Sequence, residues 1–370
     1  MSGSVTSAVR RPRLQALANG KVILGAESAE VSDNGYLQSN RFRLTIAIGP
    51  DKDMTPAWWS DNTDVMVEIK VGLLPDGAAE GTGTYTSLII GSADLVEVDL
   101  IRGTIHVEGR DLAAKLIETK TQESYSNKTS SQIATILAGN HGLTPVVTAT
   151  STPVGQYYQL EHDKLTLNNF SRQTTEWDLL TSLADLEGFD VWVQGKELHF
   201  GPAPDSQGTV FGIIYQPGPP VVSNVLTIAM ERHLLLANDI QVTVKTWNAK
   251  HKAAFTRVVK ASGATAPPKK AGTTAPQNYV FVKPNLTPDQ ALKFGQQKLV
   301  ELTRHERIVR VEMPGELVLT TRGMVSLTGT GTSWDQQYYV AELTREIGEH
   351  GFYQRLRLKN SSPRTQQTVL

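Results

Sequence analysis

The residues whose types could support catalysis are few, and their spacing matches no known reaction centre. Cysteine is absent, which excludes disulfides, thiolate zinc sites and cysteine nucleophiles. The eight histidines show no HExxH spacing, and His162-Asp163 is an adjacent pair whose side chains need not converge. No G-x-S-x-G nucleophile elbow is present. We therefore predict no catalytic residue, no cofactor and no metal site, and we interpret His162-Asp163 as polar residues on the surface.

Two segments look at first like ligand-binding loops. Gly81–Thr84 and Gly329–Thr332 both read Gly-Thr-Gly-Thr, but neither ends in the Gly-Lys-Ser/Thr that would hold phosphate and magnesium. Both are predicted to be hairpin loops. Asp51 and Asp53 have the chemistry to take up calcium, yet the other ligands of an EF-hand are missing, so we expect a solvated loop there.

A tryptophan pair is the first candidate binding feature. Trp58 and Trp59 follow Pro56-Ala57 in a predicted loop between strands, and two adjacent indoles are costly to leave in water. Packing into the core and burial against another subunit explain the pair equally well. Trp58 and Trp59 are therefore candidate subunit or partner contacts.

A basic stretch near the last third of the chain is the second candidate. It consists of Arg304, His305, Arg307 and Arg310. These cations could line a lumen through which DNA passes, or they could pair with Glu301, Glu306 and Glu312. Ion pairing is the favoured interpretation, and the three arginines are kept as candidate subunit or partner contacts. The Lys269-Lys270 pair is expected to be solvent-exposed.

Composition limits the class of protein. At 370 residues the chain is long for one core, and domains of roughly 100 to 200 residues predict two to four packed units. The 36 Lys and Arg nearly balance the 37 Asp and Glu, which argues against binding polyphosphate through a net positive field. No apolar run approaches the roughly 18 to 20 residues that span a bilayer, and residues 1–13 lack a signal-peptide core. We expect a soluble protein without stable membrane insertion.

Residues 1–109 are predicted to form strands because their apolar side chains recur at every second position. Asn19-Gly20 is a strong hairpin signal. Phe42, Leu44 and Ile46 fall on one face of their strand, which gives it one buried and one wet side. Similar runs follow at 65–71 and 88–107. Together they indicate a small antiparallel barrel or sandwich.

Residues 110–220 are predicted to mix helices with strands. Helix-spaced apolar residues begin after Gly109, and a short helix is expected at 130–138. The clearest helix runs from Thr175 to Glu187, because Thr175 and Asp178 form a capping box and Gly188 suits a left-handed C-cap. A hairpin around Gly195-Lys196 completes this insert.

Strands return in residues 221–360, which we assign to a second β unit. A segment at 263–277 has too little apolar surface to offset its ordering entropy, so we expect an exposed, mobile loop. One helix is predicted to start at Thr287 as N-cap, with Pro288 at N1, and to run to about Thr303. Residues 361–370 are expected to be a frayed tail.

Short ordered motifs give a resemblance to a known family. In the insert they are Val107 to Leu112, Ser130 to Gly142, and Glu176 to Leu180 continuing through Gly188-Phe189 to Leu198 and Phe200. Near the end they are Gly323-Met324-Val325, Tyr338 to Ala341, and Gly351-Phe352. In order and spacing this series resembles the late-control D family of phage tail, or baseplate, hub proteins. The resemblance covers roughly residues 104–200 and 320–360.

The resemblance implies an α+β, β-rich fold with two tube-like antiparallel β-barrel domains flanking the mixed α/β insert. It also implies a structural protein rather than an enzyme: a homotrimeric ring that adapts a six-fold tail tube to a three-fold spike. The implied partners are a tail spike protein, a tail tube protein and a tape-measure protein, with DNA only as cargo passing the lumen. The implied location is the virion tail, assembled in the host cytoplasm. Because the chain ends after the second barrel, we expect the spike to be a separate protein.

Two rival functions make different predictions. A receptor- or carbohydrate-binding tail protein would expose Trp58, Trp59 and Trp334 for stacking on sugar rings, and would bind its ligand as a monomer. A cell-wall hydrolase is disfavoured because no carboxylate pair or metal-ligand set has a recognisable spacing, although pairs distant in sequence stay open. Ring formation has a physical motive of its own, because pairing covers strand edges that would otherwise aggregate.

Overall fold

The computed structural model describes most of the chain in ordered elements. The described residues are 10–35, 37–75, 84–120, 123, 125–154, 156–158, 163–165, 175–202, 210–233, 240–248, 253–260, 277–284, 286–303 and 305–360. The predicted loop at 263–277 lies outside them except for Gln277, and so does the predicted tail at 361–370. None of the helices in these ranges is long and apolar enough to cross a membrane.

The first β unit contains seven strands and one short helix. They are β1 (Arg10–Ala18), β2 (Lys21–Val22), β3 (Ala26–Asn34), β4 (Arg41–Ala47), α1 (Pro56–Asp61), β5 (Met66–Pro75), β6 (Tyr85–Asp99) and β7 (Thr104–Asp111). Their order in the sheet is β3-β4-β7-β6-β5-β1-β2. Phe42, Leu44 and Ile46 are buried as their alternation predicts, and Asn19-Gly20 turns between β1 and β2 with positive φ at both residues.

The insert is an α/β unit with its own core. It contains α2 (Ala113–Glu118), α3 (Ser130–Asn140), β8 (Thr144–Val147), β9 (Gln156–Tyr158), β10 (Asp163–Leu165), α4 (Glu176–Glu187), β11 (Asp190–Gln194) and β12 (Glu197–Gly201). The predicted capping box of Thr175 and Asp178 is confirmed, and Gly188 adopts the left-handed conformation at the C-cap. Helices α3 and α4 pack with the β11-β12-β8 sheet around a common core.

The second β unit again contains seven strands, interrupted by a second α/β unit. The strands are β13 (Phe211–Gln216), β14 (Val222–Ser223), β15 (Thr227–Arg232), β19 (Arg307–Pro314), β20 (Met324–Thr328), β21 (Gln336–Gly348) and β22 (Gly351–Asn360). The interrupting unit consists of β16 (Ile240–Asn248), β17 (Ala253–Lys260), β18 (Gln277–Val282) and α5 (Pro288–Thr303). Its core is separate from that of the second β unit, a division that the sequence pattern does not indicate.

The two β units repeat one topology. Taken in chain order, β1 to β7 correspond to β13, β14, β15, β19, β20, β21 and β22. With these correspondences the second sheet order, β15-β19-β22-β21-β20-β13-β14, is that of the first unit. Both units also carry an irregularity at the same place, between Ala93 and Leu95 in β6 and between Val340 and Glu342 in β21. One pairing differs, because β13 runs parallel to β20 whereas β1 runs antiparallel to β5.

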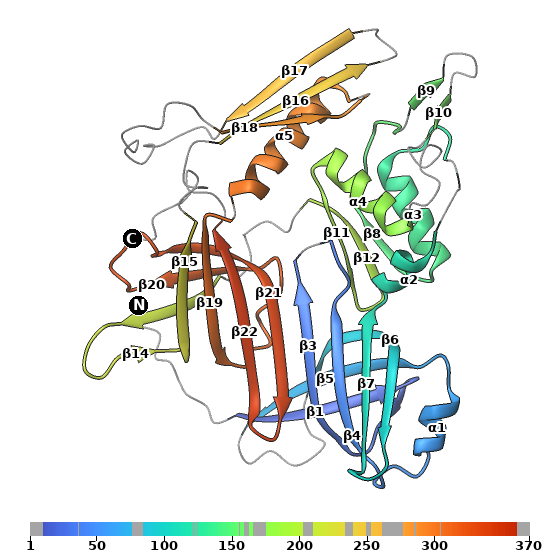
Figure 1. The fold of residues 1–370 in the computed structure, drawn as a ribbon, viewed down its shortest axis with the longest axis vertical. Helices are drawn as coiled ribbons and strands as arrows, with labels where there is room; N and C mark the ends of the chain where they lie inside the picture. Colours follow the sequence, from blue (N-terminus) through green and yellow to red (C-terminus); the bar gives the residue numbers. More distant parts are fainter. Residues whose placement is uncertain are drawn as a thin grey trace.

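The two units are joined edge to edge into one sheet of fourteen strands by pairing between β3 and β21. The predicted α+β, β-rich class is confirmed. No closed barrel is detected among the described strands: both sheets curve around a core without a closing ladder, although β1 lies against β3 in the first unit. Both β units lie in the lower part of Figure 1, and both α/β units lie above them. The exact domain boundaries 1–109, 110–220 and 221–360 stay predictions.

Gly109 should be indispensable to the first β unit. A Cβ at this position would lie 2.2 Å from the Ser92 carbonyl oxygen and 2.5 Å from Cζ of Phe42, so backbone and core would both have to move. We expect Gly109→Ala to lower the free energy of unfolding by about 2–3 kcal/mol, measured by urea denaturation. The control is Gly139→Ala in α3, where an added Cβ meets nothing within 4 Å. Equal stability of the two variants would contradict this account.

Candidate functional site

The seam between the two β units is an antiparallel ladder with buried charges. Pairing runs from Glu342 opposite Asn34 to Ile347 opposite Ala29. Beside it, the Nη1 of Arg345 donates to a carboxylate oxygen of Asp33 at 3.0 Å, and Nη2 donates to the Leu319 carbonyl. Arg345 is 5% exposed, so this ion pair is removed from water and links β21 to β3.

Burial shifts the pKa values of the acids at this junction. Burial raises the pKa of Asp33 to about 6 against the opposing attraction of Arg345, and it lowers the pKa of Arg345. Asp111, at the end of β7, accepts hydrogen bonds from the backbone N–H groups of Asn40 and Ala113. Burial nevertheless raises its pKa to about 7. Asp33 at the seam and Asp111 at the end of β7 are therefore carboxyl groups whose charged forms cost free energy.

Arg322 ties the insert to both β units. Its guanidinium lies over the Trp192 ring at 4.8 Å, and its Nε is 3.6 Å from a carboxylate oxygen of Asp190. The same side chain donates to the Gly35 carbonyl, just beyond β3. Arg322 comes from the second β unit, Trp192 from the insert and Gly35 from the first unit. One buried cation thus connects three units.

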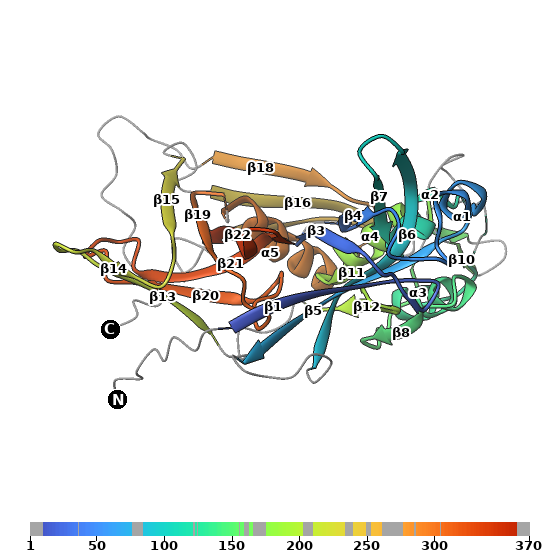
Figure 2. The ribbon, with the colours of Figure 1, turned by 90° about the horizontal axis from the view of Figure 1, so that it is seen from below.

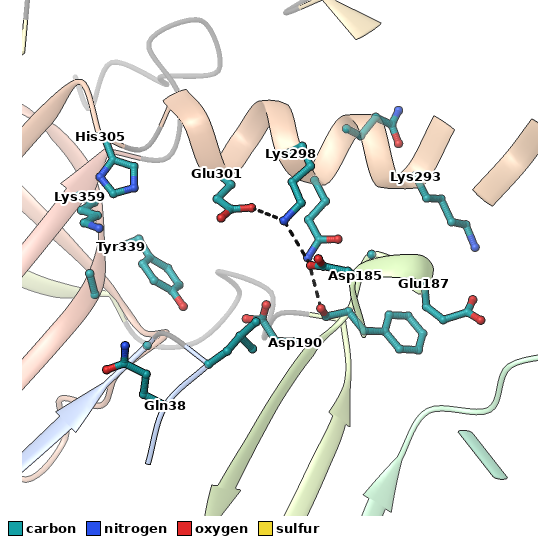
Figure 3. A pocket seen from close by; sticks show the side chains of 17 residues that line it. Gln38, Asp185, Glu187, Asp190, Lys293, Lys298, Glu301, His305, Tyr339 and Lys359 are labelled. Carbon is teal, nitrogen blue, oxygen red and sulfur yellow. Dashed lines mark hydrogen bonds and ion pairs between the residues drawn. The ribbon is translucent and has the colours of Figure 1, made fainter. Parts of the chain in front are cut away.

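Next to this junction lies a cavity of about 720 Å³ lined by residues from all four units (Figure 3). Its labelled lining residues are Gln38, Asp185, Glu187, Asp190, Lys293, Lys298, Glu301, His305, Tyr339 and Lys359. The Lys298 Nζ donates to Glu301 at 2.8 Å and to Asp185 at 3.3 Å, which joins α5 to α4. Lys359 is almost fully buried, and burial lowers its pKa to about 8. The cavity is a junction between packed units.

The lining of this cavity does not form a recognisable reaction centre. Its carboxylates contact lysine, arginine or serine groups: Asp185 and Glu301 contact Lys298, Asp190 faces Arg322, and Glu187 accepts from Ser130. Within the described ranges, no group of three or more His, Asp or Glu side chains is arranged to hold a metal ion. The geometry supports positioning of the units relative to one another.

The tryptophan pair lies in the first β unit. Its segment is the short helix α1, whereas the sequence predicted a loop, because Thr55 caps the helix and Pro56 begins it. Trp59 is 1% exposed within the core, and Trp58 packs edge-on against it with ring centroids 4.9 Å apart. Trp58 is only partly buried, so a contact with another subunit stays a prediction for that residue.

The basic stretch is spread over different environments. Arg307 is buried, lies 5.4 Å over the Trp334 ring and donates to the Ser333 carbonyl. Arg310 remains accessible on β19 and pairs with Glu231 of β15 at 2.9 Å, a partner that the sequence did not indicate. Arg304 lies outside the described residues. The structure does not bring these arginines together into one basic surface within the described part of the chain.

The loops with candidate ligand chemistry are held by their own hydrogen bonds. Asp51 accepts from the backbone N–H groups of Leu24, Asp53 and Met54. In the loop Gly329–Thr332, Asp335 accepts from the backbone N–H groups of Thr330 and Gly331. Gly81–Gly83 and His162 lie outside the described residues. The residues that define the junction, Arg345, Arg322 and Asp33, were missed, because nothing local marks their long-range pairing.

Comparison with protein families gives one assignment. The model described as the Alg8 N-terminal domain matches residues 94–349, which is more than half of the chain. The chain belongs to the Alg8 N-terminal domain family. That description names no tail or baseplate protein, so the late-control D resemblance is not confirmed by it. No curated protein sequence matches the chain.

Solved structures with the same fold come from tail-like assemblies. A tail protein from Neisseria meningitidis MC58 superposes with a TM-score of 0.67 and 15% identity, over 95% of this chain and 96% of its own. A 43 kDa tail protein of prophage MuSo2 from Shewanella oneidensis gives 0.65 and 16%, over 95% and 98%. An Escherichia coli component of the type VI secretion system gives 0.53 and 10%, over 96% and 79%. This member of the Alg8 N-terminal domain family therefore shares its fold with these proteins along almost its whole length.

The buried carboxyl of Asp111 should give stability a distinct pH dependence. Its folded-state pKa of about 7 lies above the ordinary 3.8, so folding takes up a proton between these values. The stabilising contribution is complete below about pH 3.8 and is lost as the pH rises through about 7. Relative to Asp111→Asn, wild type should therefore lose stability, on the order of a few kcal/mol, across this window. Urea unfolding at several pH values measures the difference.

Asp51→Asn serves as the control for that experiment. Hydrogen bonds from the backbone N–H groups of Met54 and Leu24 lower the pKa of Asp51, so its contribution is lost only as the pH falls below the ordinary carboxyl range. The gap between wild type and Asp51→Asn should stay constant from about pH 5 to 7. A gap between wild type and Asp111→Asn that is equally constant would show that Asp111 does not titrate as described.

Proposed function

We propose that this protein is a structural subunit of a phage tail or phage-tail-like particle, working as a trimeric baseplate hub. The observation that carries the proposal is the internal repeat: each chain holds two β units of one topology, joined side by side through β3 and β21. Three such chains present six similar units. A ring of that kind adapts a six-fold tail tube to a three-fold spike by pseudo-repetition.

The placement of the units fits two different partners. The β units lie at one end of the molecule and the α/β units at the other, so a ring of these chains has two unlike faces (Figure 1). We assign the β face to a tail tube protein and the α/β face to a separate tail spike protein. A tape-measure protein is a further partner, and DNA passes the lumen only as cargo. The protein then resides in the virion tail after assembly in the host cytoplasm.

This function requires no chemistry. The similar solved structures are tail and secretion-system proteins, which supports a structural role. The carbohydrate-binding alternative called for exposed Trp58, Trp59 and Trp334. Trp59 is buried, Trp58 packs against it, and Trp334 lies beneath the Arg307 guanidinium, so that alternative gains no support from these rings.

Light scattering of the purified chain over a dilution series tests the proposal. We expect a particle of three times the chain mass, or a monomer that becomes this particle when the spike protein is added, because the ring needs three copies. Class averages in negative-stain electron microscopy should then show six similar lobes. A monomer at every concentration that ignores tail components and binds glycan would contradict the hub and favour the carbohydrate-binding alternative.

A further inference from the structure

The internal repeat specifies which strand edges are equivalent. Within one chain, β3 of the first unit pairs with β21 of the second. The counterpart of β3 in the second unit is β15, and the counterpart of β21 in the first unit is β6. A seam built from β15 and β6 would therefore be a second copy of the seam between β3 and β21.

Both of these counterpart edges lack a strand partner within the described residues. On one edge, β21 pairs with β20 through residues 336–339 and then with β3 through residues 342–347. On the equivalent edge, β6 pairs with β5 through residues 85–92, and the Ala93 N–H donates to the Val65 carbonyl at 2.9 Å. Helix α1 also contacts β6, and residues 94–99 have no second strand as a partner on this edge. Strand β15 pairs with β19 on one edge only. Open edges of this kind are templates for pairing with another chain.

Apolar side chains at the equivalent positions are exposed where the seam would bury them. Ile347 at the tip of the β21–β22 hairpin is 5% exposed because it enters the core of the first unit, together with Phe352. Its counterpart Leu100, at the tip of the β6–β7 hairpin, is 72% exposed, and Ile101 beside it is 97% exposed. Likewise Val31 of β3 is 1% exposed, whereas its counterpart Met230 of β15 is 45% exposed. Such exposure is typical of an interaction surface.

We propose that β15 of one copy adds antiparallel to the end of β6 of a second copy, reproducing the seam between β3 and β21. This inference rests on the proposed trimeric hub and names its intermolecular contact. Transferring the register of the intramolecular seam places Met230 opposite Val98, Arg232 opposite Val96 and Ile228 opposite Leu100. The hairpin tip with Leu100 and Ile101 then enters the second β unit of the neighbour, as Ile347 enters the first unit.

The two edges cannot meet within one chain. Strand β15 lies at one side of the molecule and β6 at the other in both views (Figures 1 and 2). The contact is therefore head-to-tail, and repeating it closes a ring when the rotation per copy allows it. Each chain then contributes one intramolecular seam and one intermolecular seam.

The two seams differ in their side chains. Where the intramolecular seam has Arg345 bound to Asp33, the equivalent positions of the intermolecular seam carry Val98 and Arg232. Arg232 already pairs with Glu306 of its own unit at 3.0 Å. In this part of the intermolecular contact, the side chains that become buried when two copies join are apolar. Because no ion pair crosses there, assembly should resist high salt.

Cysteine cross-linking tests the register directly, because the natural chain has no cysteine. One chain carries Val98→Cys and a second carries Met230→Cys, and the two are mixed under mild oxidation at a concentration where light scattering gives the trimer mass. Residues directly opposite in an antiparallel ladder have the Cα spacing of a disulfide. We expect a disulfide-linked dimer from the mixture at least about tenfold above that from either chain alone.

Replacing Val98→Cys by Thr86→Cys, on the part of β6 that is already paired with β5, is the matched control and should not link to Met230→Cys. A trimer that forms without linkage between positions 98 and 230 would overturn the named contact and leave the proposed hub standing. A chain that is monomeric at every concentration, with and without the spike protein, would overturn the hub and this contact together.

A disrupting variant gives an independent readout. Met230→Lys places a charge in the named contact, yet Met230 is half exposed in the single subunit, so thermal unfolding of the monomer should not change. The concentration for half assembly should rise at least about tenfold. Val282→Lys, at a 73% exposed valine on β18, is the control and should assemble as wild type. Unchanged assembly of Met230→Lys would overturn the contact.

Discussion

The structure depends on how it satisfies the backbone edge of β3. An unpaired edge strand presents a row of N–H and C=O groups that attract other chains. Here β21 pairs with that row, although the two strands are more than three hundred residues apart in the sequence. One of the pairs is Ser32 and Thr344, whose hydroxyl oxygens lie 3.2 Å apart. The pairing fixes the two β units side by side. The junction cavity and the placement of the insert both require this relative position of the β units.

Buried charges specify the junction more than they stabilise it. Removing Arg345 and Asp33 from water costs several kcal/mol per ion, and their attraction offsets this only in good geometry. An apolar pair could hold the seam as firmly but would tolerate a shifted register. A bound pair of opposite charges tolerates fewer alternatives. Arg322 adds a second such constraint, because Trp192, Asp190 and the Gly35 carbonyl must all lie within its reach.

Local structure could be predicted from the sequence because its causes are local. The alternation of Phe42, Leu44 and Ile46, the capping box of Thr175 and the cap of the last helix at Thr287 are each set by neighbouring residues. Pairing between β3 and β21 is not set by neighbouring residues, because any strand with alternating apolar side chains could pair with β3. The repeated topology of the two β units could not be predicted from the sequence either. Topology requires apolar side chains at positions such as Val67 and Val325, and it leaves outward positions such as Glu97 and Thr344 free to differ.

The positions of the α/β units in the repeat are compatible with the proposed ring. One follows β7, and the other interrupts the second β unit between β15 and β19, so they enter at different points of the repeat. Both nevertheless lie on the same end of the β units, where α4 packs against α5 and Lys298 joins them (Figure 1). Among the described residues, neither insertion adds a strand to the outer edge of β15 or to residues 94–99 of β6. The chain can therefore elaborate one face without losing the strand edges by which copies would join.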